Sequence, residues 1–143
     1  FLDILENHKM LVENSGLLTV AALKHLDCKG KRVVSILSGG NMDIITLSSV
    51  VQHGLIARGR VFTVAVQLPD RPGELVNVAD IIAKEKGNVI RLEHNQFVSI
   101  NRNAAVELRI TLEAFGQEHK NEILKALRDK GYDAKEETPT GMY

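Results

Sequence analysis

Ser38, Gly39, Gly40 and Asn41 form a small polar turn at the end of an apolar run in the segment RVVSILSGGNMD. An amphipathic segment follows directly, with the carboxylate of Asp43 in its first turn. Free N–H groups at a glycine turn and at a helix N-terminus attract anions and polar ligand edges. The pattern therefore predicts one of two things. Either the turn contacts a ligand, or it is a plain tight turn in which Asn41 caps the helix and Asp43 complements its dipole.

A second turn, LPDRPGEL, joins an alternating apolar segment to an amphipathic one. Pro72 fixes φ at a first helical position, Gly73 lets a ligand approach the backbone, and Asp70 can cap exposed N–H groups. One interpretation is a pocket in which backbone N–H groups bind a carboxylate while Asp70 or a carbonyl binds an ammonium, which suits an amino acid. The alternative is a well-built helix start without a ligand.

The other reactive residue types form no constellation. The five histidines show no metal-ligand spacing and Cys28 is a single cysteine, so we expect no metal site. No Lys-Ser or Lys-Thr pair follows the glycines as in a P-loop, and no Gly-x-Ser-x-Gly nucleophile elbow occurs. A self-contained hydrolase is therefore not predicted.

The composition is that of a soluble globular protein, with 143 residues, 44% apolar and 25% charged. The 18 basic and 18 acidic residues give no net charge, so neither a nucleic acid nor a membrane surface is a predicted partner. One cysteine and no apolar run long enough to span a bilayer favour the cytoplasm. Because the first residue is Phe1 and FLDILENHKMLVEN has the pattern of a helix leading into a strand, we expect a fragment of a longer protein.

The N-terminal part has the pattern of a parallel α/β domain. Residues 10–13 and 33–37 are mainly apolar runs without alternation, and each precedes a helical pattern. Such runs are typical of strands covered on both faces, and a parallel sheet needs more than two of them. We therefore expect residues 1–56 to be the last piece of a larger α/β domain, with a linker at residues 57–60.

The pattern changes after the linker to the period of two that is typical of half-covered strands. Strands and helices are then predicted in the order βαββαβ, which is the ferredoxin-like α+β arrangement of an antiparallel sheet with two helices on one face. The predicted elements are strands at 62–68, 88–94, 105–113 and 132–136, and helices at 70–87 and 117–131. A domain of roughly 75 residues is near the lower limit for an independent core, so we expect at least a dimer.

Several segments, in this order, resemble a known enzyme family. VENSGLLTVAAL, VVSILSGGNMD and GLIARGR, followed by FTVAVQLPDRPGEL, closely resemble the C-terminal part of pyridoxal-phosphate-dependent threonine dehydratases that carry an ACT regulatory domain. The resemblance covers essentially the whole chain. It implies a remnant of a fold-type-II catalytic domain at residues 1–56 and a ferredoxin-like ACT domain at residues 61–143. A single ACT unit resembles the catabolic type of the enzyme.

The resemblance also assigns roles around the first turn. It implies that the hydroxyl of Ser38 binds the pyridine nitrogen of pyridoxal phosphate in the parent enzyme, and that Gly39, Gly40 and Asn41 form the turn beside the ring. Glu13 matches a glutamate near the same site. The glutamate motif of the family usually continues with proline and Ser-Gly-Ala, whereas this chain continues with Asn-Ser-Gly-Leu.

Two motifs of the family are missing from this chain. They are the Schiff-base lysine motif Ser-Phe-Lys-x-Arg-Gly and the glycine-rich phosphate loop. We therefore expect no catalytic residue here, no pyridoxal phosphate bound to this chain alone, and no activity without the rest of the parent.

The function implied by the resemblance is regulatory. The chain would be the amino-acid-sensing, dimerising end of an enzyme that deaminates threonine or serine to 2-oxo acids, with isoleucine, valine, threonine or serine as effector. The alternative is an oligomerisation module without an effector site. The residues implied to bind the effector are Asp70, Arg71, Pro72, Gly73, Glu74, Leu75, Asn88 and Val89.

Overall fold

The computed structural model describes residues 1–95 and 106–137. The chain forms two compact units, an N-terminal unit of residues 1–54 and a C-terminal unit of residues 55–143. The division between them falls within one helix, α3 (Ile44–Ala57). Among the described residues no helix is long and apolar enough to cross a membrane.

The N-terminal unit consists of short helices around a small core. Leu2, Val12 and Leu17 are its buried apolar side chains, and Leu2 packs so closely on Gly54 that a Cβ there would lie 2.5 Å from the leucine Cδ1. The helices before α3 are α1 (Leu2–His8), a 3-10 turn (Ser15–Leu17), α2 (Leu18–Ala22) and a second 3-10 turn (Leu23–His25).

The two parallel strands predicted in this unit are not formed. Residues 10–13 and 33–37 are irregular, and Val34 and Ile36 are 89% and 74% exposed. A strand exists only where its N–H and C=O groups pair with a neighbouring strand, and the described part of this unit supplies none to either run. Apolar sequence alone therefore predicted strands that have no partner here.

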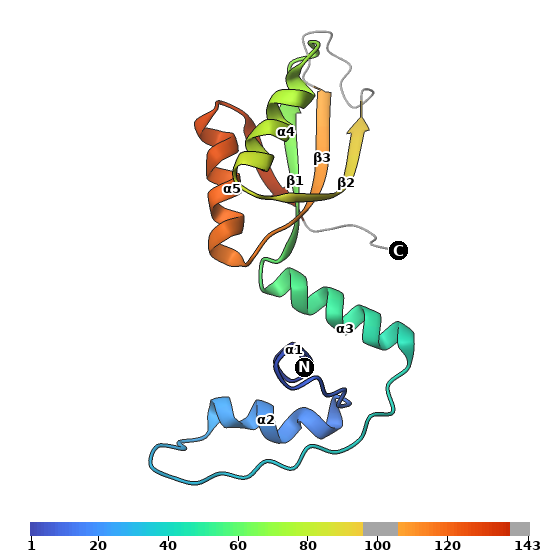
Figure 1. Ribbon diagram of the computed structural model, residues 1–143, viewed down its shortest axis with the longest axis vertical. Coiled ribbons are helices and arrows are strands. Elements are labelled where there is room, and N and C mark those ends of the chain that lie inside the picture. Colours follow the sequence, from blue (N-terminus) through green and yellow to red (C-terminus); the bar gives the residue numbers. More distant parts are fainter. Residues whose placement is uncertain (96–105, 138–143) are drawn as a thin grey trace. The chain divides into compact units, whose positions relative to one another are not determined.

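The C-terminal unit has the predicted ferredoxin-like fold (Figure 1). Its antiparallel sheet has the strand order β2-β3-β1-β4. The elements are β1 (Val61–Leu68), α4 (Glu74–Lys84), β2 (Asn88–Asn95), β3 (Val106–Glu113), α5 (Gln117–Asp129) and β4 (Asp133–Glu137). The order βαββαβ is thus confirmed. The predicted start of α4 was too early, because residues 70–73 form a turn before the helix.

Alternation along the strands builds the core between the sheet and the two helices. Every second residue of β1 and β3 faces α4 and α5, and each such side chain contributes about 1.5–3 kcal/mol on burial. The buried set is Phe62, Val64, Val66, Leu68, Val78, Ile82, Leu108, Ile110, Leu112, Ala114, Ile123, Leu124, Leu127 and Ala134.

The opposite face of the sheet is polar. The buried hydroxyls of Thr63 and Thr111 lie 3.0 Å apart across β1 and β3. Arg109 lines the same small hollow as these threonines. It pairs with Glu107 at 2.9 Å and with Glu137 at 3.4 Å. This face therefore combines buried threonines with partly exposed charged side chains.

His119 ties the start of α5 to the end of α4. Its Nδ1 accepts a hydrogen bond from the Phe115 N–H at 3.0 Å, so the proton is on Nε2, which donates to the Glu85 carbonyl. The Phe115 ring stacks on the imidazole with centroids 4.7 Å apart. This histidine is a structural link. Among the described residues no three His, Cys, Asp or Glu side chains gather to hold a metal ion.

Candidate ligand sites

The structure brings Glu13 against the Ser-Gly-Gly-Asn turn. The Glu13 N–H donates to the Gly39 carbonyl at 3.0 Å. Gly39 has φ +77°, and a Cβ there would lie 2.4 Å from the Glu13 carboxyl carbon. The left-handed φ therefore favours glycine at position 39, and a larger residue there would also displace the Glu13 carboxylate. Glu13 and the Ser-Gly-Gly-Asn turn, which the resemblance assigns to the same cofactor site, are therefore neighbours in the N-terminal unit.

Two residues that follow Glu13 in sequence also contact this site, Gly16 at the turn and Ser15 at the Glu13 carboxylate. A Cβ at Gly16 would lie 1.7 Å from the Ser38 carbonyl oxygen, and the Ser15 hydroxyl donates to Glu13 Oε1 at 2.6 Å. Sequence reasoning did not assign either residue to the site. The sequence feature that could have identified them is the Ser15-Gly16 pair in the segment VENSGLLTVAAL, which also contains Glu13.

Asp43, not Asn41, caps α3. The Thr46 N–H donates to Asp43 Oδ1 at 2.9 Å and the Thr46 hydroxyl donates to Oδ2. These bonds, first that of the hydroxyl and then that of the N–H, lower the pKa of the Asp43 carboxyl. The capping alternative for Asn41 is therefore wrong, and its side chain lies outside the cap, on the exposed turn.

The β1–α4 turn differs from its prediction in how the helix begins. Gly73, with φ +96°, is the N-cap of α4, and no side chain caps the helix. Asp70 therefore does not act as the cap, and Pro72 precedes the helix instead of opening it. A Cβ at Gly73 would meet no atom within 4 Å. The turn thus leaves first-turn N–H groups without a side-chain cap beside open space, an arrangement that accepts a carboxylate.

Glu74 and Leu75 follow the turn but point to different surroundings. The Glu74 carboxylate accepts a hydrogen bond from the Tyr132 hydroxyl at 2.9 Å. Leu75 is exposed. Glu74 is thus bonded to the connection between α5 and β4, whereas Leu75 remains accessible beside the turn.

Asn88 and Val89 lie at the other end of the sheet from the turn. Asn88 pairs with Glu113, which pairs with Val61 at the start of β1, whereas the turn follows Leu68 at its end. An eight-residue strand separates these positions by about 23 Å. One chain therefore does not bring Asn88 to Gly73. The Asn88 amide instead donates to Glu113 Oε2 at 3.1 Å.

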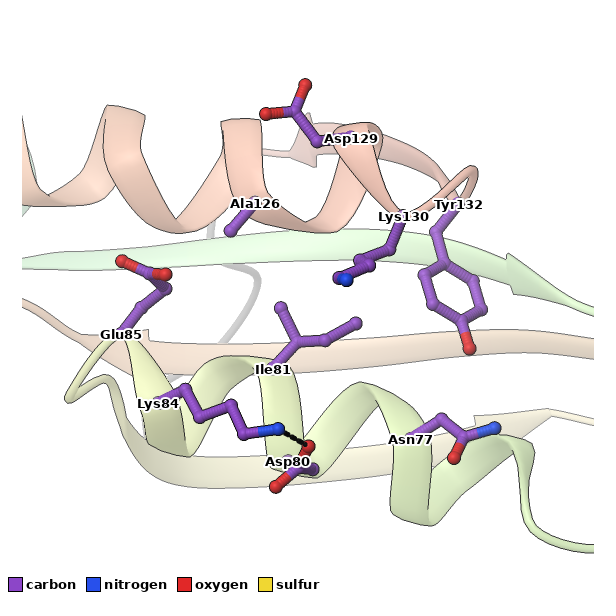
Figure 2. Close-up of a pocket in the computed structure, with 9 residues that line it drawn as sticks. All are labelled: Asn77, Asp80, Ile81, Lys84, Glu85, Ala126, Asp129, Lys130 and Tyr132. Atoms are coloured by element: carbon purple, nitrogen blue, oxygen red, sulfur yellow. Dashed lines mark hydrogen bonds and ion pairs between the residues drawn. The ribbon is translucent and has the colours of Figure 1, made fainter.

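A groove that sequence reasoning missed lies between α4 and α5 (Figure 2). Its volume is about 530 Å³. Figure 2 shows Ile81 and Ala126 facing each other across it, with Tyr132 at one end. The lining residues are Asn77, Asp80, Ile81, Lys84, Glu85, Ala126, Asp129, Lys130 and Tyr132. Because these come from segments far apart in the chain, only the helix packing reveals the groove.

Comparison with known proteins gives three informative relatives, although no family model matches the chain. L-threonine ammonia-lyase of Geobacter sulfurreducens is 39% identical over 132 residues, covering 90% of this chain and 33% of the relative. L-threonine ammonia-lyase of Thermotoga maritima is 33% identical, covering 94% and 34%. The biosynthetic L-threonine dehydratase of Pasteurella multocida is 32% identical, covering 92% and 25%.

Among solved structures, the regulatory subunit of aspartate kinase from Thermus flavus aligns with a TM-score of 0.44 at 18% identity, over 55% of this chain and 52% of that one. The chain spans a quarter to a third of the length of the relatives named above. By sequence the chain therefore belongs with the threonine ammonia-lyases and threonine dehydratases, and it corresponds to their C-terminal part.

Proposed function

We propose that the C-terminal unit is a dimerising regulatory domain that senses a small amino acid, and that the full-length protein is a threonine dehydratase. The parent would remove ammonia from threonine or serine to give 2-oxo acids, with pyridoxal phosphate as cofactor. The names of the relatives support this reaction class. The ferredoxin-like fold of the described part of the C-terminal unit supports the regulatory assignment.

The observation that carries the proposal is the separation of the two halves of the effector site. Within one chain Asn88 and Gly73 lie at opposite ends of the sheet. β1 and β2 run in the same direction, because both are antiparallel to β3 (Figure 1). If β2 pairs antiparallel with β2 of a second copy, the start of the partner strand comes to the end of the sheet that carries this chain's turn. Two-fold pairing thus completes a site that one chain leaves incomplete.

The surface of β2 favours such pairing. It is an edge strand in the sheet order, and Val89, Ile90 and Leu92 are 41%, 46% and 43% exposed. A long edge strand with exposed apolar side chains tends to pair with another strand. An eight-stranded sheet across two copies would satisfy the edge N–H and C=O groups and bury these side chains.

Each part of the site then has a chemical role. Backbone N–H groups at the start of α4 bind the effector carboxylate, and Asp70 or a turn carbonyl binds its ammonium. Leu75 contacts an aliphatic side chain of the effector. The second copy supplies an amide from its own β2 start. Arg71 and Pro72 shape the exposed turn around the ligand.

The N-terminal turn fits one edge of pyridoxal phosphate. Ser38 is exposed beside Gly39, where no Cβ can intervene, and Glu13 lies against the same turn. A serine hydroxyl can hydrogen-bond the pyridine nitrogen without charging it, and Gly40 and Asn41 continue the turn alongside. When bound, the cofactor acts as the electron sink for α-proton removal and β-elimination. In the parent, effector binding would shift the population of the states in which Ser38 is correctly placed.

Isothermal titration calorimetry of the chain with isoleucine, valine, threonine and serine tests the sensing function. We expect at least one of them to bind. Gly73→Leu should abolish binding while the dimer persists, because its side chain fills the approach to the helix N-terminus. Gly30→Leu is the matched control, since Gly30 also has a positive φ and open surroundings but lies in the N-terminal unit. A folded dimer that binds none of the four would instead support the oligomerisation module without an effector site.

A further inference from the structure

Tyr132, on the connection between α5 and β4, contacts the first residue of α4. Its hydroxyl donates to Glu74 Oε2 at 2.9 Å, across 58 residues of sequence. Glu74 directly follows Gly73, the N-cap of α4. The hydrogen bond therefore ends one residue away from the proposed effector turn.

Among the described residues, the other hydrogen bonds of that turn are local. Asp70, Arg71 and Pro72 are exposed, and no side chain caps α4. Two backbone hydrogen bonds stay within the turn, one from the Arg71 N–H to the Pro69 carbonyl at 2.8 Å and a long one from the Glu74 N–H to the Arg71 carbonyl at 3.4 Å. These bonds shape the turn locally but do not attach it to the rest of the unit.

Tyr132 is a rigid anchor by comparison. Its ring packs against the hydrophobic core, and its N–H donates to the Leu127 carbonyl at 3.2 Å. Arg128 Nε closes the same corner by donating to the Ala134 carbonyl at 3.0 Å. Figure 2 shows the Tyr132 hydroxyl turned toward α4, on the side where Asn77 lies. The Asn77 N–H in turn donates to the Gly73 carbonyl at 3.0 Å.

We propose that Tyr132 is a positioning residue of the effector site, whose hydroxyl holds Glu74 and thereby fixes the α4 N-terminus for the ligand carboxylate. The hydroxyl does not touch the effector. Without the Tyr132 hydroxyl, the turn and the start of α4 would keep only local backbone bonds and would sample several orientations, and the ligand must then select one of them at a cost in affinity. This inference rests on the proposed sensing function.

Tyr132→Phe removes the donor and keeps the ring, so it tests the inference. In calorimetry with the amino acid that binds the wild-type chain, we expect a dissociation constant about tenfold higher, the scale of a hydrogen bond to a charged group. Glu74→Ala should weaken binding by a similar factor. Glu74→Gln, which keeps an acceptor, should restore most of the affinity. The double variant Tyr132→Phe/Glu74→Ala should be no weaker than either single variant, because both remove the same link.

Thr111→Val is the control for general destabilisation, since it removes a buried hydrogen bond from the other face of the sheet. It should leave the dissociation constant unchanged. If the wild-type chain binds and Tyr132→Phe binds within twofold of it, the positioning role is wrong and the sensing function stands. Additive effects of the two single variants would also overturn the link. If the wild-type chain binds none of the amino acids, the sensing function fails and this inference fails with it.

Discussion

Gly59 lies so close to Gln117 that a Cβ at position 59 would be 2.9 Å from the Gln117 Cα and 3.1 Å from its N. Next to it, the Ala114 N–H donates to the Arg60 carbonyl at 2.8 Å. The segment that the sequence predicts to be a linker is therefore packed, at Gly59 and Arg60, against the connection between β3 and α5. Gly59 is buried there with φ +65°.

Gly59→Ala should destabilise the C-terminal unit by about 2–4 kcal/mol, because a left-handed φ and backbone overlap act together. Urea unfolding of the chain measures the effect. Gly131→Ala has the same conformational strain, with φ +88°, but no atom within 4 Å of the new Cβ, so it should cost only about 1 kcal/mol. Equal losses for the two variants would refute the close packing at Gly59.

Lys120 is a buried cation whose partner is half exposed. Its Nζ lies 2.8 Å from Glu136 Oε1, and the side chains are 8% and 47% exposed. Glu136→Gln should cost about 1–2 kcal/mol of unfolding free energy, since it leaves the buried ammonium without a countercharge. Lys120→Met should cost less, because an apolar chain of similar length suits the site. Glu137→Gln, on the exposed pair with Arg109, should change stability by less than about 0.5 kcal/mol.

The proposed pairing of two β2 edges can be tested by placing a charge on this strand. Leu92→Lys should shift the chain toward monomer in analytical ultracentrifugation, because paired edges would then bury two ammonium groups. Ile45→Lys is the matched control, as Ile45 is an exposed apolar residue of α3, away from the β2 edge in sequence. A dimer that persists unchanged in Leu92→Lys would exclude the β2 edge as the interface.

The Asp43 cap predicts how α3 responds to acid. Hydrogen bonds from Thr46 lower the pKa of this carboxyl below its ordinary 3.8. The cap is therefore fully formed above that value and is lost as the pH falls through the lowered pKa. In an NMR titration, Thr46→Val should move the Asp43 pKa back toward 3.8. An unchanged titration midpoint would show that the threonine bonds do not stabilise the carboxylate.

The raised pKa of the Tyr132 hydroxyl predicts that its contribution to the free energy of unfolding is lost at alkaline pH. Burial, and then the hydrogen bond to Glu74, raise the pKa of its hydroxyl above the ordinary 10.0. Its contribution is fully present below 10.0 and is lost as the pH rises through the raised pKa. The stability difference between the wild-type chain and Tyr132→Phe should therefore shrink above that pH. The other charged groups of the groove, Asp80, Lys84, Glu85, Asp129 and Lys130, are common to both proteins and cancel in this difference.

Much of the C-terminal unit follows from local pattern. The alternation of Phe62, Val64 and Val66, and the helical spacing of Ile123 and Leu127, report which side each element buries. This periodicity involves only residues that are close in sequence, so it can be recognised without knowledge of the fold. The same reasoning failed for residues 33–37, since a strand also needs a partner that local sequence does not supply.

The sequence did not predict which residue caps or starts α3 and α4. Asp43 rather than Asn41 caps α3, and Gly73 rather than Asp70 starts α4. All four residue types are common at helix starts, so residue preference alone does not predict which member of each pair begins the helix. The backbone path into the helix makes the choice.

By itself, the sequence determined the element order and the core faces of the C-terminal unit, and the positions of the glycine turns, because these depend on periodicity and on the conformational range of single residues. Tertiary structure alone decided that Glu13 meets Gly39, that Tyr132 reaches Glu74, and that Asn88 lies far from Gly73. Such relationships join residues distant along the chain, and their geometry exists only once the sheet and helices have packed.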